Sequence, residues 1–85
     1  MSASFQIELT DLARVKLRKQ EPQIRDRVVR KLKQAATNPS RYLERLSSLE
    51  SYKLRVGNYR VIVDVDWNRQ ILYVLTLGHR SVIYG

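Results

Sequence analysis

The sequence contains no cysteine and a single histidine, His79. Without cysteine there is neither a disulfide framework nor a thiolate ligand for zinc, and one imidazole cannot form a histidine cluster. We therefore expect no structural metal site. Glycine and proline are also scarce, at 3 and 2 residues, while 44% of the residues are hydrophobic. Such a composition is typical of a folded chain and excludes a disordered tail.

No apolar segment approaches the roughly 18 residues of a membrane-spanning helix, and the first residues lack the basic and apolar regions of a signal peptide. We therefore expect a cytoplasmic protein. At 85 residues the chain has the length of one domain, residues 1–85, with a single sheet and a layer of helices. A domain of this size has little room for an enclosed pocket, and we expect no cofactor.

Acidic residues are few: 8 Asp and Glu stand against 16 Lys and Arg, which gives a formal charge of +8. The surplus is concentrated between residues 14 and 45, where 11 of the 16 bases but only 3 of the 8 acids occur. This distribution indicates a polyanionic partner, which composition leaves open as RNA, DNA or an acidic protein. Solubilising charges on the outer faces of two helices are the alternative interpretation.

The first part of the chain predicts a strand followed by two helices. Residues 5–9 alternate apolar and polar side chains, as a short strand does. The next helix carries Leu12, Val15 and Lys19 on one stripe and ends before Pro22, which suits the first turn of a second helix. The apolar positions of that second helix recur at the helical period: Ile24, Val28, Leu32 and Ala35.

The remainder predicts a connection over 41–51 and then strands over 52–56, 59–65 and 70–77, with a short edge strand at 82–84. In the strand 70–77, alternate residues are expected to share one face: Ile71, Tyr73, Leu75 and Leu77. The order β, α, α and then a β-β-β meander indicates an α+β domain. Its two N-terminal helices pack on one face of a small, mainly antiparallel sheet.

A two-residue loop between two of these strands, Gly57-Asn58, predicts a type II′ hairpin. This register places Arg55 opposite Arg60, with Lys53 on the same face, which we expect to be the face that the helices leave open. Like charges directly across a strand pair are destabilising, and residues that lower stability in this way tend to occur at functional sites. A phosphate on this face would turn the repulsion into charge-assisted hydrogen bonds. Alternatively, the arginines diverge into water or a nearby carboxylate relieves one of them.

Three features are distinctive together: the run YKLRVGNYRVIV at 52–63, the segment LGHR at 77–80 and Tyr84 near the end. With the basic two-helix segment before them, they resemble the RelE/ParE toxin superfamily, and specifically its RelE-type mRNA interferases. The resemblance implies a RelE-like β-α-α-β-meander fold and an acidic RelB-like antitoxin as partner. It also implies a ribosome-dependent endoribonuclease that inhibits translation. Such enzymes cleave mRNA without a metal, by attack of the ribose 2′-OH on the adjacent phosphate.

The resemblance also implies a set of site residues. Arg60 matches the family arginine after the hairpin, Arg80 the one that follows the Gly-His pair, and Tyr84 the C-terminal tyrosine. Lys53 and Arg55 stand where the best-known form has a Lys-x-Lys pair, so the second lysine is replaced by an arginine. We expect Arg55 to bind phosphate and the other four residues to be catalytic.

Cleavage by 2′-OH attack needs a base, cations for the phosphate charge and an acid for the leaving oxygen. Lys53 is the candidate base, and Arg60 is suited to hold phosphate because a guanidinium stays protonated. Arg80 clamps phosphate or assists the leaving group, and Tyr84 stacks on a base or orients the hydroxyl. His79 is the other candidate acid or phosphate contact, since imidazole titrates near neutrality. A lone histidine at a strand end is also common as a hydrogen-bonded loop residue.

Two other functions fit the same residues. A ParE-type gyrase inhibitor shares the fold and acts by binding a protein, although that branch generally lacks the arrangement of Arg80 and Tyr84. A non-catalytic basic module that binds RNA or the ribosome is the second alternative. For such a module, replacing Arg60 or Arg80 would weaken binding and reduce its salt dependence, with no chemistry to abolish.

Overall fold

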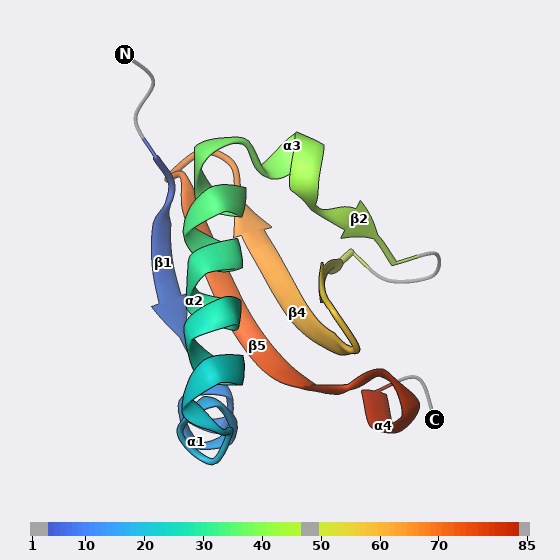
Figure 1. Ribbon diagram of the computed structural model, residues 1–85. Helices are drawn as coiled ribbons and strands as arrows, with labels where there is room; N and C mark the ends of the chain where they lie inside the picture. The colour runs from blue at the N-terminus through green and yellow to red at the C-terminus, as the bar shows by residue number, and fades with distance from the viewer. Residues whose placement is uncertain (1–3, 47–49, 84–85) are drawn as a thin grey trace.

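The computed structural model describes residues 4–46 and 50–83. Helices α1 and α2 lie on one face of a single sheet (Figure 1), so the predicted α+β fold class is confirmed. Along the chain the elements are β1 (Gln6–Leu9), α1 (Asp11–Arg18), α2 (Pro22–Thr37), α3 (Pro39–Tyr42), β2 (Glu44–Arg45), β3 (Tyr52–Val56), β4 (Tyr59–Asp66), β5 (Ile71–His79) and α4 (Arg80–Ile83).

The five strands form one sheet in the order β1-β5-β4-β3-β2. β1 pairs with β5 in parallel, whereas the other neighbouring strands pair antiparallel, in agreement with the mainly antiparallel sheet that the sequence predicts. Because β1 starts beside the last strand, the chain must pass through both helices before it builds the opposite edge. The β3–β4 hairpin therefore lies toward one edge of the sheet, with only the two-residue strand β2 outside it.

α1 begins at a side-chain cap that also joins it to the sheet. The Thr10 hydroxyl Oγ1 accepts a hydrogen bond from the backbone N–H of Ala13 (3.1 Å) and donates one to the carbonyl oxygen of Leu75 (2.8 Å). It thereby satisfies one N–H group that the first helical turn leaves unpaired. Ala13 is fully buried. Its small side chain lets α1 lie close to the sheet.

The stripe of α1 that the sequence singles out faces solvent. Leu12 and Val15 are 55% and 43% exposed, and Lys19 is exposed as well. The helix turns Ala13 and the half-buried Leu17 inward instead. The apolar residues of this short helix therefore divide between two sides, and only Ala13 and Leu17 face the core.

α2 follows the predicted pattern closely. Pro22 lies in its first turn, where the missing N–H costs no helical hydrogen bond. Val28, Leu32 and Ala35 are buried and Ile24 is half-buried, so the predicted inward stripe is confirmed. No helix among the described residues is both long and apolar enough to cross a membrane.

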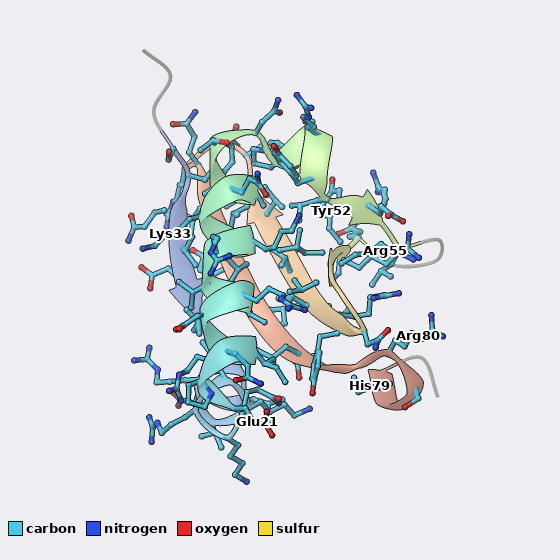
Figure 2. The ribbon with its side chains drawn as sticks, viewed as in Figure 1. Glu21, Lys33, Tyr52, Arg55, His79 and Arg80 are labelled. Carbon is cyan, nitrogen blue, oxygen red and sulfur yellow. The ribbon has the colours of Figure 1, made fainter. Side chains whose placement is uncertain are left out.

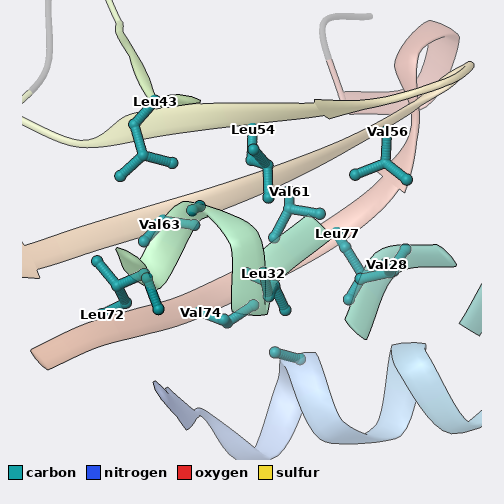
Figure 3. Close-up of a cluster of buried hydrophobic side chains, with 13 residues drawn as sticks. Val28, Leu32, Leu43, Leu54, Val56, Val61, Val63, Leu72, Val74 and Leu77 are labelled. Carbon is teal, nitrogen blue, oxygen red and sulfur yellow. The ribbon is translucent and has the colours of Figure 1, made fainter. Parts of the chain in front are cut away.

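The hydrophobic core lies between α1 and α2 and the sheet face that they cover (Figure 3). Alternate residues of β3 and β4 point into it, which fixes the register because a slip by one residue would turn them to solvent. Its fully buried larger side chains are Leu72, Leu77, Val28, Val56, Val61, Val63 and Val74. The opposite face of the sheet carries the polar and charged residues of the same strands, and we call it the open face.

An irregularity between β4 and β5 changes which side chains of β5 point inward. Ile62 pairs with Thr76 but Val63 pairs with Val74, so Leu75 is left between them as a β-bulge. The buried residues of β5 are Leu72, Val74 and Leu77. The prediction that Ile71, Tyr73, Leu75 and Leu77 share one face was wrong, because the extra residue shifts the alternation by one.

The segment predicted as a connection over 41–51 is partly regular. The short helix α3 and strand β2 lie within its first half, and Leu43 between them is buried. β2 pairs with the start of β3, with Glu44 opposite Lys53. This pairing places a carboxylate beside the predicted cations of the hairpin.

The C-terminal edge strand predicted at 82–84 was wrong, because residues 80–83 form the helical turn α4. The backbone N–H of Arg80 donates to the carbonyl oxygen of Asn58 (2.8 Å), beyond the last strand pair. The N–H of Ser81 then donates to Nδ1 of His79 (3.2 Å), a bond of the kind that caps a helix start. Tyr84, a predicted site residue, lies outside the described residues.

A candidate phosphate-binding site at the end of the hairpin

The β3–β4 hairpin has the turn and register that the sequence predicts. Gly57 has a φ of +59°, whereas Asn58 has a negative φ, as in a type II′ turn. Arg55 pairs with Arg60, and Lys53 pairs with Ile62 on the same face. Because Leu54, Val56 and Val61 are buried beneath the helices, these three cations all belong to the open face.

Arg60 is buried, although it belongs to the open face. Only 5% of the residue is exposed, and Nη1 donates hydrogen bonds to the carbonyl oxygens of Gly57 (3.0 Å) and Tyr59 (2.9 Å). On β5 its register partner is Gly78, which has no side chain to occupy the space beside it. Arg60 therefore lies on the predicted open face, but its guanidinium is buried because it folds back onto the carbonyls of its own turn. Its remaining N–H groups make no hydrogen bond within the described part of the chain.

The other two cations of the hairpin have different surroundings. Arg55 is exposed, and among residues 4–46 and 50–83 it pairs with no carboxylate. Lys53 is half-buried, and its Nζ lies 3.6 Å from Oε2 of Glu44. No sequence pattern indicates this ion pair, because a two-residue strand such as β2 is too short to show an alternating pattern.

Arg80 lies beside the turn, as the predicted site requires. Its backbone N–H is bonded to Asn58, so the first residue of α4 is held against the hairpin loop. The Arg80 side chain is exposed. Figure 2 shows Arg55 and Arg80 at the same edge of the molecule, away from α2. The end of the hairpin thus gathers Arg55, Arg60 and Arg80 from three elements.

His79 does not share the face of Arg60. It is the register partner of Tyr59, and the two rings meet edge to face at 5.6 Å between centroids and 77° between planes. Tyr59 packs against the core from the helix side. The exposed imidazole therefore lies on the helix side of the turn, across the sheet from Arg60.

The far end of the open face is acidic. Glu8, Tyr73 and Asp64 lie in one row across β1, β5 and β4. Asp64 and Asp66 line a shallow hollow of about 570 Å³ with Trp67 and Tyr73. This feature is not evident from the sequence, because Glu8 on β1 lies far along the chain from Asp64 and Asp66 on β4. The open face is therefore basic at the hairpin turn and acidic at the other end.

The hairpin end is suited to bind a phosphate group. Guanidinium groups donate in a planar fork that matches phosphate oxygens, and here two of three arginines are exposed and without an ion pair in the described structure. Within the same described residues no group of three or more His, Asp or Glu side chains has the arrangement to hold a metal ion.

A family model described as "ParE toxin of type II toxin-antitoxin system, parDE" matches residues 5–84. No individually curated protein matches the chain.

Solved structures of several toxins share this fold. The toxin–antitoxin complex RelBE2 from Mycobacterium tuberculosis contains a chain that is 25% identical, with a TM-score of 0.83 and coverage of 92% of this chain and 100% of that one. The isolated Escherichia coli RelE toxin gives 20% identity, a TM-score of 0.78 and coverage of 95% and 92%. The archaeal RelE–RelB complex from Pyrococcus horikoshii OT3 contains a chain that is 19% identical, with a TM-score of 0.77 and coverage of 92% of this chain and 97% of that one.

The E. coli and Pyrococcus likenesses, both under 25% identical, concern the fold alone, whereas the family model matches nearly the whole chain. The β-α-α-β-meander arrangement that the sequence predicts is the one these toxins have. The chain belongs to the ParE toxin family, within the RelE/ParE superfamily, and is a toxin of a type II toxin–antitoxin system.

Proposed function

We propose that this toxin is a ribosome-dependent endoribonuclease that cleaves mRNA and so inhibits translation. The observation that carries the proposal is the gathering of Arg55, Arg60 and Arg80 around one turn at the edge of the open face. Like charges directly across a strand pair repel each other, and of this pair only Arg60 has hydrogen-bond partners in the turn. A phosphodiester at this place would bridge the arginines and offset their repulsion.

The residues divide the work of 2′-OH attack as follows. Lys53, at the start of the hairpin, takes the 2′ proton, and Arg55 and Arg60 hold the charge that builds on the phosphate oxygens. Arg60 acts from a fixed position, because two carbonyl bonds hold its Nη1. Arg80 stabilises the charge of the leaving 5′ oxygen, which takes its proton from water, and Tyr84 stacks on a base next to the cleaved bond. The placement of Tyr84 in this scheme rests on the resemblance alone.

Mapping of mRNA ends tests the proposal. The chain is induced in growing cells, beside an Arg80→Ala variant, and the 5′ ends of messenger RNA are sequenced. We expect new 5′-hydroxyl ends inside translated codons with the native chain and a loss of most of them with Arg80→Ala. In a purified system the cuts should require ribosomes. Intact messages in cells that stop growing would reject the nuclease and leave a binding mechanism.

A ParE-type gyrase inhibitor is the second candidate, and the match to the ParE family model favours it. Such a toxin acts by binding a protein, so its signature is trapped gyrase cleavage complexes on DNA. We expect none at toxin concentrations that stop translation. A basic module that binds ribosomes without cleaving RNA is the third candidate, and it would sediment with ribosomes while leaving the messages intact.

We further propose that an acidic RelB-like antitoxin binds this toxin, and that mRNA on the ribosome is its substrate. The structures from M. tuberculosis and P. horikoshii are toxin–antitoxin complexes. The formal charge of +8 and the basic end of the open face complement an acidic segment. A segment of that kind would order on binding and cover the arginines that the substrate needs.

A further inference from the structure

The charge pattern of the open face limits where an RNA strand can run. From the phosphate site at the turn, one direction along the face leads to Asp64, Asp66 and Glu8. No ion pair neutralises these carboxylates within the described residues. A polyanion that continues that way meets like charge on a surface with few cations. A strand longer than a few nucleotides therefore has to leave the face over the turn of the hairpin.

Beyond the turn, α2 supplies a cation. A Cβ placed on Gly57 would lie 3.3 Å from Nη1 of Arg27, so this guanidinium lies directly against the loop from the helix side. Arg27 is exposed and forms no ion pair among the described residues. Glycine at position 57 thus serves two purposes: it permits the positive φ of the turn and leaves room for Arg27 to approach.

His79 and Tyr59 lie on the same side of the turn as Arg27. Nδ1 of His79 accepts the N–H of Ser81 (3.2 Å) and lies 2.9 Å from its hydroxyl. That ring nitrogen is therefore the acceptor, and the proton of the neutral imidazole is on Nε2. The exposed ring consequently offers a donor and an aromatic face, the two groups that bind splayed single-stranded RNA.

We infer that Arg27, His79 and Tyr59 form a second RNA subsite on the helix side of the hairpin. It receives the nucleotides next to those bound at the arginines of the open face, and the strand bends over Gly57 between the two. The Arg27 guanidinium binds a backbone phosphate, and the imidazole of His79 contacts a base or the next phosphate. This inference rests on the proposed function, whose substrate is single-stranded mRNA, and it assigns His79 to binding rather than proton transfer.

Binding to RNA that cannot be cleaved tests the subsite. Fluorescein-labelled 2′-O-methyl oligoribonucleotides of about 3 and about 12 nucleotides are titrated with the full chain by anisotropy. The longer probe spans both sides of the turn, whereas the shorter one is covered by the open-face arginines. We expect Arg27→Ala to weaken binding of the longer probe about fivefold or more and to leave the shorter one nearly unchanged. Arg27→Lys should restore part of the affinity.

Lys33→Ala is the matched control. It removes one positive charge from the same helix, and Figure 2 shows Lys33 on the side of α2 away from the hairpin. We expect it to weaken both probes slightly and equally, through long-range charge alone. Equal effects of Arg27→Ala and Lys33→Ala on the two probes would overturn the subsite.

His79→Asn tests the second contact without removing the helix cap, because an asparagine oxygen can accept the N–H of Ser81. We expect about threefold or greater weakening of the longer probe only. Failure of the native chain to bind the longer probe more tightly than the shorter one would also overturn the subsite. A native chain that cuts no mRNA but keeps this length dependence would sink the nuclease and support the subsite.

Discussion

Arg55 and Arg60 face each other across the β3–β4 hairpin, yet one guanidinium is exposed and the other is buried against the carbonyl oxygens of Gly57 and Tyr59. The repulsion that the pairing implies is thus reduced by sending the two charges into different surroundings. The buried guanidinium of Arg60 donates to two carbonyl oxygens in place of water. Arg60 therefore supports the turn in addition to its proposed role toward phosphate.

The two arginines should differ in their contribution to stability. Arg60→Ala removes two partly buried hydrogen bonds from a charged donor and leaves two carbonyls without their partner, which should lower the free energy of unfolding by about 2 kcal/mol. Arg55→Ala removes an exposed charge that faces a like charge, and we expect a change within about 0.5 kcal/mol. Urea denaturation at low and moderate salt measures the free energy of unfolding of both variants. Equal losses for the two variants would contradict the division of roles.

Gly57→Ala should destabilise the hairpin through its backbone. The φ of +59° lies in the region that a Cβ disfavours by about 1–2 kcal/mol. The contact with Arg27 adds little, because 3.3 Å to the end of a flexible side chain is relieved by a small movement. Thermal unfolding of Gly57→Ala alone and combined with Arg27→Ala separates the terms. Full recovery of stability in the double variant would show that the destabilisation comes from the contact with Arg27 instead.

Thr10→Ala should remove the cap of α1 and its tie to β5 together. Both hydrogen bonds of the hydroxyl are lost, so we expect about 1–2 kcal/mol of destabilisation. Thr37→Ala is the control, because the exposed Thr37 hydroxyl bonds only to the carbonyl oxygen of Gln34 at the end of α2 (2.6 Å). A change within about 0.5 kcal/mol is expected there. Urea denaturation measures the stability of both variants. Similar losses of stability at both threonines would be evidence against the link between Thr10 and β5.

The elements with an unambiguous period were predictable from the sequence. The inward-facing stripe of α2 has four residues at the helical period. The two-residue loop at Gly57-Asn58 fixes the register of β3 and β4 without any tertiary information. That register alone brought Arg55 and Arg60 together. The hairpin half of the candidate site was therefore predictable from the sequence alone.

The features that sequence could not predict depend on contacts between distant segments. The bulge at Leu75 has no composition signal, and it reverses the alternation that was assumed for β5. α4 forms where an apolar run indicated a strand, because Asn58 and His79 provide hydrogen bonds from outside the segment. Likewise, the burial of Arg60 depends on how the turn presents its carbonyls. The contact between Arg27 and Gly57 depends on where α2 crosses the hairpin.

Lys53→Met should slow cleavage of mRNA on programmed ribosomes by about 100-fold or more in single-turnover experiments, as loss of a general base does. Glu44→Gln breaks the 3.6 Å ion pair with Lys53 but keeps the shape of the side chain. Because such a partly exposed pair is weak, we expect the rate to stay within about threefold of native. The reverse ranking, a large loss with Glu44→Gln and a small one with Lys53→Met, would move the proton transfer from the lysine to the carboxylate.

The chemistry itself should require the 2′-hydroxyl on the 5′ side of the cut. The gathered side chains of the hairpin are arginines and a lysine, which stabilise charge and move a proton but do not attack phosphorus at the proposed site. In the proposed mechanism the nucleophile is therefore the 2′-hydroxyl of the RNA itself. A message with a single 2′-deoxy nucleotide before the scissile phosphate should not be cut at that bond by the native toxin on the ribosome, while cuts at neighbouring codons continue.

The native message should yield a 2′,3′-cyclic phosphate and a 5′-hydroxyl, which mass spectrometry and a polynucleotide kinase assay identify. Cleavage of the deoxy-substituted message at the same bond would show that water or a protein group attacks instead.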